Sequence, residues 1–213
     1  MWKIVVLTCA YKRTEIFKKF VDNVPYKLVV VGDEQNQQEL KNGVYLLHEN
    51  KPLGKKWNYG LQFCKNMDFD YLVITGSDDL FCPNLWQWYQ TINVHYAGLL
   101  DLYFIDGLRV KYCAGFNKNR YGEPHGAGRV LHRSVLEELD WTLWDDNINI
   151  GLDASMTTRL QRLDMQTQFI KIKDMGFVAA DIKTSENLHS HKEYSGVWCD
   201  QEERRYVFKR LNL

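Results

Sequence analysis

The sequence predicts an α/β fold built on a mainly parallel sheet, and three observations support this. Short β-branched runs alternate with segments of helical periodicity through the first half of the chain. Each run stops at a polar or glycine-containing cluster, as a buried strand does. The spacing between runs leaves room for one crossover helix, so the connections should be right-handed βαβ units. At 213 residues the chain suits one domain with a sizeable core.

Four strands and two helices are expected in the first half. The strands should lie at 3–10, 27–33, 43–49 and 70–76. One helix should run through 15–21 and end before Pro25. The other should cover 55–66, where Trp57, Leu61 and Cys64 recur at helical spacing.

The polar clusters that follow these strands should meet at one edge of the sheet. In parallel sheets, ligands bind beyond the carboxyl ends of the strands. Those ends are residues 8–13, Asp33 and residues 77–79. The sequence therefore predicts a functional site at this edge.

The second half is less regular. Strand material is expected at 102–113 and 167–173, with a polar, glycine-rich loop at 117–128. Helices are expected at 134–144, 152–163 and in the basic stretch 204–213. Ser134 should be the N-cap of the first of these, with Glu137 completing a capping box. We find no linker, repeat or low-complexity tract and expect one domain over 1–213.

Composition excludes several classes of protein. Lys+Arg and Asp+Glu are both 27, and a nucleic-acid binder would normally carry a basic excess. The five cysteines are scattered without a CxxC pair, which indicates reduced thiols in the cytosol. No signal-peptide core is present, and no apolar stretch approaches the roughly 20 residues that cross a bilayer. We expect a soluble cytoplasmic protein with no membrane segment and no nucleic-acid partner.

Two adjacent acids, Asp78 and Asp79, stand just after the apolar run 71–74, separated from it by the residues 75–77. Adjacent carboxylates repel each other, so burying both without a counter-charge is costly. A divalent cation that prefers oxygen ligands, such as Mg²⁺ or Mn²⁺, would remove that cost. The alternative is that both acids cap a helix starting near Pro83, with their side chains in solvent.

The motifs, taken in order, resemble those of the GT-A glycosyltransferases, especially the family-2-like branch that uses nucleotide-diphosphate sugars. The resemblance spans nearly the whole chain. The segments that carry it downstream of the first strands are GSDDL (76–80), HGAGR (125–129), GLDASMTTRL (151–160) and DIKTSENLHSHKEY (181–194). It implies a single GT-A, Rossmann-like domain with a mixed, mainly parallel sheet flanked by helices. Residues 1–100 would form the half that binds the nucleotide sugar, and 101–213 the half that binds the acceptor.

The resemblance also implies a donor site. In the family, the loop after the first strand cradles the nucleotide, and an acid after the second strand contacts uracil or ribose. The segment GKKWNYG (54–60) matches a helix start of the family, with Trp57 where the family has Arg. This departure leaves open which of Lys55 and Lys56 faces the nucleotide. The implied donor-binding residues are Thr8, Ala10, Tyr11, Arg13, Asp33, Lys55, Lys56, Asn58, Ser77 and Asp78.

The same resemblance implies a metal site for Mn²⁺ or Mg²⁺. Asp79 and Asp78 would hold the ion, together with His189 or His191 from the late loop. Both histidines could equally be ordinary surface imidazoles.

Asp153 matches the acid that serves as catalytic base in inverting members, although Leu152 replaces the Glu before it. Two alternatives stay open. Asp153 could be an acid favoured by the helix dipole, and the acceptor pocket could use Asp145 or Asp146 instead.

The implied activity is transfer of a hexose from a nucleotide-diphosphate sugar, expected to be UDP-linked, to a hydroxyl of a glycan or glycoprotein, with inversion. The resemblance is strongest to the branch with which chloroviruses glycosylate their capsid protein. That would make the chain one domain of a longer enzyme acting in the host cytoplasm. Two rival classes remain: a sugar-phosphate nucleotidyltransferase, whose usual glycine-rich phosphate loop is missing from TCAYKRTE (8–15), and a non-catalytic nucleotide-sugar-binding module.

Overall fold

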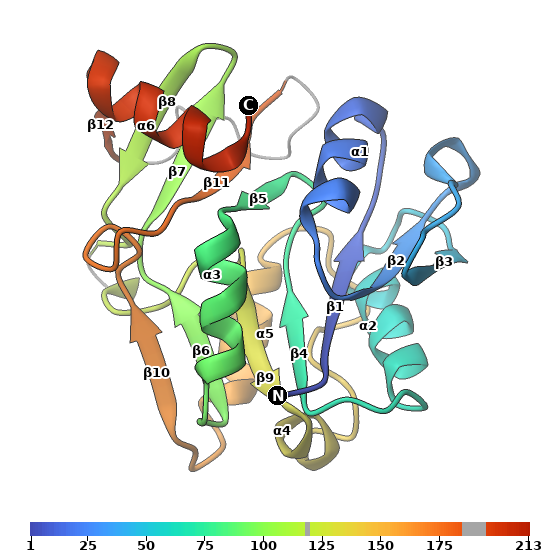
Figure 1. Cartoon of the computed structure of the whole chain (residues 1–213). Coiled ribbons are helices and arrows are strands. Elements are labelled where there is room, and N and C mark those ends of the chain that lie inside the picture. Colours follow the sequence, from blue (N-terminus) through green and yellow to red (C-terminus); the bar gives the residue numbers. More distant parts are fainter. Residues whose placement is uncertain (118–119, 185–194) are drawn as a thin grey trace.

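A seven-stranded sheet forms the centre of the protein (Figure 1). The computed structural model describes residues 1–117, 120–184 and 195–213. The strand order is β10-β6-β9-β4-β1-β2-β3. In chain order these strands are β1 (Ile4–Cys9), β2 (Lys27–Gly32), β3 (Gly43–Leu47), β4 (Tyr71–Ile74), β6 (Tyr96–Leu99), β9 (Arg129–His132) and β10 (Thr167–Ile170). Neighbours are parallel except at β9, which runs antiparallel to β4 and β6. The prediction of a mixed, mainly parallel sheet is confirmed.

A smaller sheet of five strands stands past the end of β4 (Figure 1). Its order is β12-β8-β7-β11-β5. The strands are β5 (Asp79–Phe81), β7 (Leu102–Asp106), β8 (Arg109–Cys113), β11 (Ala179–Ile182) and β12 (Val197–Trp198). Strands β5 and β11 pair antiparallel, and their register sets Asp79 opposite Asp181. Two acids from opposite halves of the chain therefore lie side by side.

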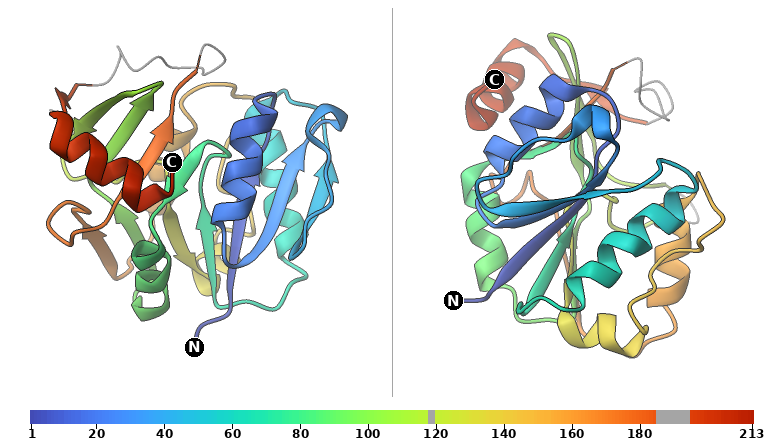
Figure 2. Two further views of the ribbon diagram at one scale, coloured as in Figure 1. Left: turned by 45° about the horizontal axis from the view of Figure 1, so that its top comes forward. Right: turned by 90° about the vertical axis from the view of Figure 1, so that its right-hand side faces the viewer.

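Helices cover both faces of the large sheet (Figure 2). They are α1 (Thr14–Asn23), α2 (Leu53–Cys64), α3 (Pro83–Trp88), α4 (Arg133–Glu138), α5 (Leu152–Leu160) and α6 (Gln201–Leu211), with short 3₁₀ turns η1 (Glu34–Asn36) and η2 (Tyr89–Thr91). Seen along the sheet edge, α1 and α3 lie on one face, and α2, α4 and α5 lie on the other. This arrangement buries both faces, which is why the central strands read as continuous apolar runs.

The large sheet separates two hydrophobic cores, and strand β1 contributes side chains to both. Successive side chains of a strand point to opposite faces. Val6 therefore packs in the core that contains Phe17 and Phe20 of α1. Val5 and Leu7 pack in the other core, against Leu61 of α2.

The expected elements of the first half are present, and the second half needs corrections. The stretch 102–113 is a hairpin of β7 and β8 that turns at Gly107, where φ is +59°. The N-cap of α4 is His132, whose Nδ1 accepts from the backbone N–H of Ser134 at 3.3 Å, so the predicted Ser134 cap is wrong. This helix also ends at Glu138 and not at residue 144. Asp140 and Trp141 have φ of +45° and +55°, which a continuing helix does not permit.

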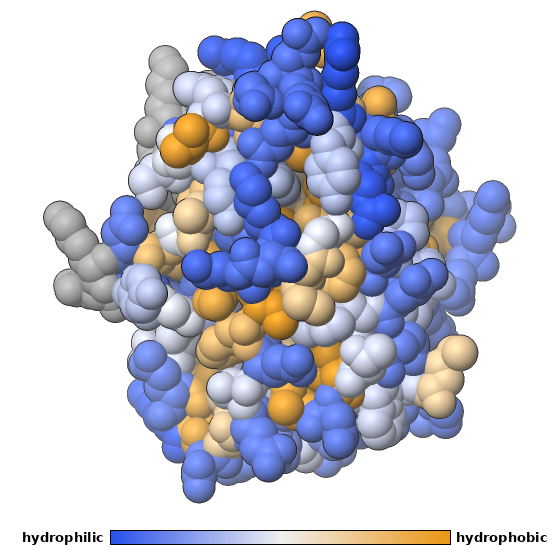
Figure 3. Space-filling model, turned by 60° about the vertical axis from the view of Figure 1, so that its left-hand side comes forward, coloured by the Kyte–Doolittle hydropathy of each residue, from blue (hydrophilic) through white to orange (hydrophobic). Residues whose placement is uncertain are grey.

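Within the described residues, no helix is both long enough and apolar enough to cross a bilayer. On the face shown in Figure 3, hydrophobic residues gather across the middle and lower part, with hydrophilic residues around and between them.

Asn23 connects the end of α1 to the strand that carries Asp79. Its Nδ2 donates to the carbonyl of Phe81 at 2.9 Å, and its Oδ1 accepts from the N–H groups of Phe81 (3.0 Å) and Trp86 (3.1 Å). Asn23→Ala leaves these groups without partners, which should cost about 1–3 kcal/mol of unfolding free energy. Chemical denaturation of Asn23→Ala measures this loss. Asn66→Ala, at an exposed position, is the control, and equal stability of the two variants would contradict the role of Asn23.

Candidate functional site

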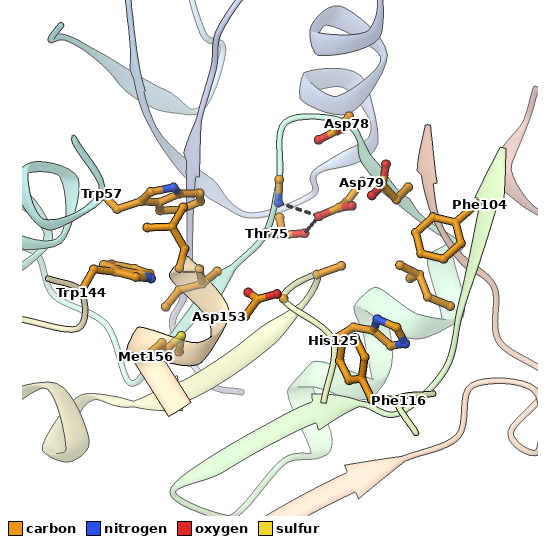
Figure 4. Close-up of a pocket in the computed structure, with 17 residues that line it drawn as sticks. Trp57, Thr75, Asp78, Asp79, Phe104, Phe116, His125, Trp144, Asp153 and Met156 are labelled. Carbon is orange, nitrogen blue, oxygen red and sulfur yellow. Dashed lines mark hydrogen bonds between the residues drawn. The ribbon is translucent and has the colours of Figure 1, made fainter. Parts of the chain in front are cut away.

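A cavity of about 210 Å³ opens at the carboxyl end of β4 (Figure 4). One wall is formed by Thr75, Gly76, Asp78 and Asp79, joined by Asp181 of β11. The facing wall is the glycine-rich segment 125–127 with the first turn of α5, which carries Asp153. Aromatic side chains line it at both ends: Trp57, Trp144, Phe104 and Phe116. A cavity with carboxylates on two opposite walls therefore lies at the edge of the sheet where the sequence predicts a functional site.

Three carboxylates form a cluster on the first wall. One oxygen each from Asp78, Asp79 and Asp181 lies within 4.8 Å of the others. Asp79 is 4% exposed, and its Oδ2 accepts from the Thr75 hydroxyl at 2.8 Å and from the Gly76 N–H at 2.6 Å. Burial, with the charges of Asp181 and Asp78, raises the pKa of Asp79 well above its usual value.

The acids do not cap a solvent-exposed helix. The N-cap of α3 is Cys82, which makes no side-chain capping bond, and Asp78, Asp79 and Ser77 are all buried. The reading of Asp78 and Asp79 as solvated caps is therefore wrong. Asp79 is also the first residue of β5 and belongs to a buried strand, not to an exposed loop.

Two cations partly neutralise the cluster. Arg13 Nη1 lies 2.5 Å from Asp78 Oδ2, and Lys183 Nζ lies 2.5 Å from Asp181 Oδ2. Burial and the nearby Asp78 raise the pKa of Asp181 to about 7, against the opposing effect of Lys183. Within the described parts of the chain, Asp181 Oδ1 is buried without a hydrogen-bond partner. An all-oxygen set with an unused lone pair is suited to Mg²⁺ or Mn²⁺.

Asp181 is a site residue that the sequence reading missed. The late loop was expected to contribute His189 or His191, and both lie outside the residues that the structure describes. The available signal was the apolar run 177–180 ending directly in an acid. It repeats the pattern that drew attention to Asp78.

Asp153 faces the cluster from across the cavity (Figure 4). A Cβ at position 126 would lie 2.4 Å from Asp153 Oδ1, so Gly126 is what lets this loop and α5 approach so closely. The other candidate acids, Asp145 and Asp146, are not among the described residues that line the cavity.

Arg129 fixes the wall that carries Asp153. Its guanidinium is fully buried and donates to the carbonyls of His125 (3.0 Å), Pro124 (2.9 Å) and Asp153 (3.5 Å). It also lies 3.4 Å from Glu123. Loop and helix are therefore held by one side chain.

His125 is held as a neutral ring in the same wall. It is buried and tilted against Phe116, with 4.6 Å between ring centroids. Burial, followed by the charge of Arg129, lowers the pKa of His125 to about 4. The imidazole is therefore uncharged at neutral pH.

The expected nucleotide loop lies beside the cavity, on the α1 side. Thr8 and Ala10 are buried, and Tyr11 is exposed. Lys12 and Arg13 adopt left-handed backbone angles, with φ of +54° and +55°. This turn places the Arg13 guanidinium on Asp78. The loop and the acid cluster, separated in sequence, are therefore in direct contact.

Asp33 lies at the end of β2 as expected. Its Oδ1 accepts from Asn36, at 3.3 Å from the backbone nitrogen and 3.1 Å from Nδ2. The Tyr45 hydroxyl donates to its carbonyl at 2.8 Å. These hydrogen bonds hold Asp33 in place directly after β2.

Two of the three residues of α2 that were expected at the donor have internal partners. Lys56 is fully buried, and its Nζ donates to the carbonyl of Ala10 (2.7 Å) and to Asn50 (3.0 Å). Asn58 Nδ2 donates to the Trp144 carbonyl (2.8 Å) and to Asp146 (2.7 Å). These contacts support the nucleotide loop and the segment 143–146 from inside. Lys55, in contrast, is exposed.

Solved structures share this architecture at low sequence identity. S. aureus TarS (1–349) in complex with UDP-GlcNAc matches with a TM-score of 0.57 and 13% identity, over 87% of this chain and 60% of that chain. Mannosyltransferase PcManGT from Pyrobaculum calidifontis, in complex with GDP-Man and Mn²⁺, matches with 0.54 and 13%, over 90% and 59%. A glycosyltransferase involved in the glycosylation of the major capsid of PBCV-1 matches with 0.50 and 12%, over 89% and 95%. This chain therefore spans about 60% of the TarS and PcManGT structures.

A nucleotidyltransferase is similar to the same degree. The inositol-1-phosphate CTP transferase from T. maritima matches with a TM-score of 0.54 and 12% identity, over 98% of this chain and 96% of that chain. No protein-family model matches the sequence, and no curated protein is similar to it in sequence. Together these likenesses show that the chain has the GT-A fold, as expected from its motifs.

Asp79→Asn separates the charge of the cluster from its packing. An amide oxygen can still accept from Thr75 and Gly76, while one of three mutually repelling charges is removed. The metal-free variant should melt at a higher temperature than the wild type, and Mn²⁺ should no longer raise its melting temperature. Thermal unfolding with and without Mn²⁺ measures both effects, with exposed Asp22→Asn as control. An undiminished Mn²⁺ shift would rule out Asp79 as a ligand.

Proposed function

We propose that this chain is a metal-dependent glycosyltransferase that moves a sugar from a nucleotide-diphosphate sugar, with uridine as the nucleoside, to a hydroxyl of a glycan or glycoprotein. One observation carries the proposal: a cavity with a three-carboxylate cluster on one wall and Asp153 on the opposite wall. Structures of the same fold hold UDP-GlcNAc, or GDP-Man with Mn²⁺, which supports this class of donor.

The acid cluster is suited to hold Mn²⁺ or Mg²⁺ through Asp78, Asp79 and Asp181. All three offer carboxylate oxygens, and Asp181 Oδ1 is a buried acceptor without a partner in the described chain. When bound, such an ion stabilises the negative charge that develops on the departing nucleoside diphosphate.

Asp153 is proposed to accept the proton of the attacking hydroxyl. The acceptor oxygen forms a bond to sugar C1 as the bond from C1 to the β-phosphate oxygen breaks, and the hydroxyl proton moves to a carboxylate oxygen of Asp153. A base must lie within hydrogen-bond reach of that hydroxyl. Because Asp153 and the acid cluster lie on opposite walls, attack and departure would occur on opposite faces of the sugar. This geometry supports inversion at C1.

Asp33 and the loop 8–13 are proposed to bind the nucleoside. A carboxylate accepts from ribose hydroxyls and from the uracil N–H, whereas it repels phosphates. Residues 1–100 would thus supply most of the donor site and 101–213 the acceptor site, although Asp181 joins the cluster from the second half. A longer chain acting in the cytoplasm is part of the same proposal.

A sugar-phosphate nucleotidyltransferase is the second candidate, because an enzyme of that class has the same fold. A reaction screen separates the candidates. The protein is incubated with Mn²⁺ and a panel of nucleotide sugars, and separately with nucleoside triphosphates and sugar phosphates. Release of nucleoside diphosphate from a nucleotide sugar supports the glycosyltransferase. Pyrophosphate formation supports the rival class, and silence in both assays supports a binding module.

Asp153→Asn should preserve the shape of the wall while removing the base. Transfer should fall by about 10²–10⁴-fold, the range for a lost general base, while donor affinity stays close to that of the wild type. Steady-state kinetics and calorimetry measure the two quantities, with exposed Asp164→Asn as control. Transfer at the wild-type rate, or a product with retained anomeric configuration, would remove Asp153 from this role.

Asp33→Ala should weaken binding of free uridine and of UDP by similar factors, because the lost contacts involve the nucleoside alone. Calorimetry with both ligands in the presence of Mn²⁺ gives the two affinities. Exposed Glu39→Ala is the control. Unchanged uridine affinity would place Asp33 outside the nucleoside pocket.

A further inference from the structure

The acid cluster is balanced by cations from the chain itself. Arg13 and Lys183 pair with Asp78 and Asp181, and all four side chains are largely buried, between 6% and 16% exposed. Asp79 adds a third carboxylate, whose Oδ2 accepts hydrogen bonds from Thr75 and Gly76. When all five groups are ionised, one negative charge is in excess.

The two cations are held differently. Arg13 belongs to the backbone turn that begins α1, where it has a left-handed conformation and its carbonyl accepts from Ile16 and Phe17 at 3.0 Å. Lys183 follows β11 directly, and its own N–H donates to the Ile105 carbonyl at 2.7 Å. Its ammonium sits at the end of a flexible four-carbon stem, which can turn about several bonds while the backbone stays in place.

The Lys183 ammonium lies beside the cavity. Nζ is 5.1 Å from the ring centroid of Phe104, and Phe104 lines the cavity. Asp181, its ion-pair partner, lines the same cavity. A ligand that enters next to the acids therefore meets this positive charge.

A divalent cation and this ammonium compete for the same carboxylates. Both are attracted to Asp181, and they repel each other at short range in a buried site, where charges interact strongly. With a divalent cation present, the cluster and its two side-chain cations carry a net positive charge. An ammonium displaced from Asp181 has lost its ion-pair partner, and the negative charge of a diphosphate group can replace that partner.

We propose that Lys183 is an exchangeable counter-ion, which neutralises Asp181 while no divalent cation is bound and contacts the donor diphosphate once a cation takes the carboxylates. The inference rests on the proposed function, and it adds Lys183 as a donor-binding residue that favours a diphosphate over an uncharged leaving group.

Lys183→Met tests the exchange through binding of Mn²⁺ alone. Removing the competing charge should tighten Mn²⁺ binding by about tenfold, because one repulsive interaction at short range is lost. Electron paramagnetic resonance of free Mn²⁺ gives this affinity without nucleotide or turnover. Lys183→Arg, which keeps the charge, and exposed Lys171→Met should both bind Mn²⁺ like the wild type. Mn²⁺ affinity that is unchanged or lower in Lys183→Met would show that Lys183 only braces Asp181.

A second titration tests the contact with phosphate. At saturating Mn²⁺, UDP affinity should fall by about tenfold in Lys183→Met, because a charge-assisted contact to phosphate is lost. The same affinity in variant and wild type would overturn the diphosphate contact. If wild-type protein binds no Mn²⁺ at all, the metal site of the proposed function fails as well, so the two failures are distinguishable.

Folding of the variant is checked independently. Metal-free Lys183→Met should melt below the wild type, because the cluster gains a second uncompensated charge. The double variant Lys183→Met, Asp181→Asn restores the charge balance and should recover the melting temperature. Failure of this rescue would show that repulsion within the cluster is not what Lys183 relieves.

Discussion

The crowding of three largely buried carboxylates, Asp78, Asp79 and Asp181, is the constraint on which the rest of this structure depends. Burial, followed by the charges of Asp181 and Asp78, raises the pKa of Asp79, and burial followed by the charge of Asp78 raises the pKa of Asp181. Several otherwise unconnected features serve to hold them there. The left-handed turn at Arg13 aims a guanidinium at Asp78, and the β5–β11 register sets Asp79 against Asp181. Together with Arg13 and Lys183, the three carboxylates form the charged wall of the cavity.

The opposite wall holds one acid, Asp153, in a fixed position. Arg129 does this through the backbone. It binds carbonyls of the glycine-rich segment and of Asp153, so that loop and helix form one unit. Burial alone would raise the pKa of Glu123, but hydrogen bonds from Arg120 and Thr157 outweigh it and lower that pKa, so a carboxylate stays available beside Arg129. The wall with the three acids therefore concentrates charge, whereas the opposite wall holds Asp153 in position.

The sequence predicted what depends on neighbouring residues and missed what depends on distant ones. Strands β1 to β4 and their helices follow from local periodicity, and Asp78 and Asp79 could be found because they end an apolar run. Asp181 became important only through pairing of β11 with β5, which no local pattern announces. Lys56 and Asn58 were read as donor ligands by their position in a motif. Their partners, Ala10 and the segment 143–146, come from distant parts of the chain. The overlong helix after Ser134 shows the same limit, because helical propensity says nothing of the left-handed residues that end it.

The placement of β9 has a consequence for how the chain assembles during synthesis. β4 and β6 leave the ribosome long before β9, yet β9 is the strand that joins them in the large sheet. Until it arrives, β4 has an open edge, and β6 has no neighbour within the nascent chain, because β10 comes later still. An unpaired apolar edge is a template for wrong pairing with other chains. β9, which runs antiparallel to its neighbours, is thus also the strand whose late synthesis delays completion of the large sheet. The βαβ units of the first half keep an open edge at β4 until β9 pairs with it.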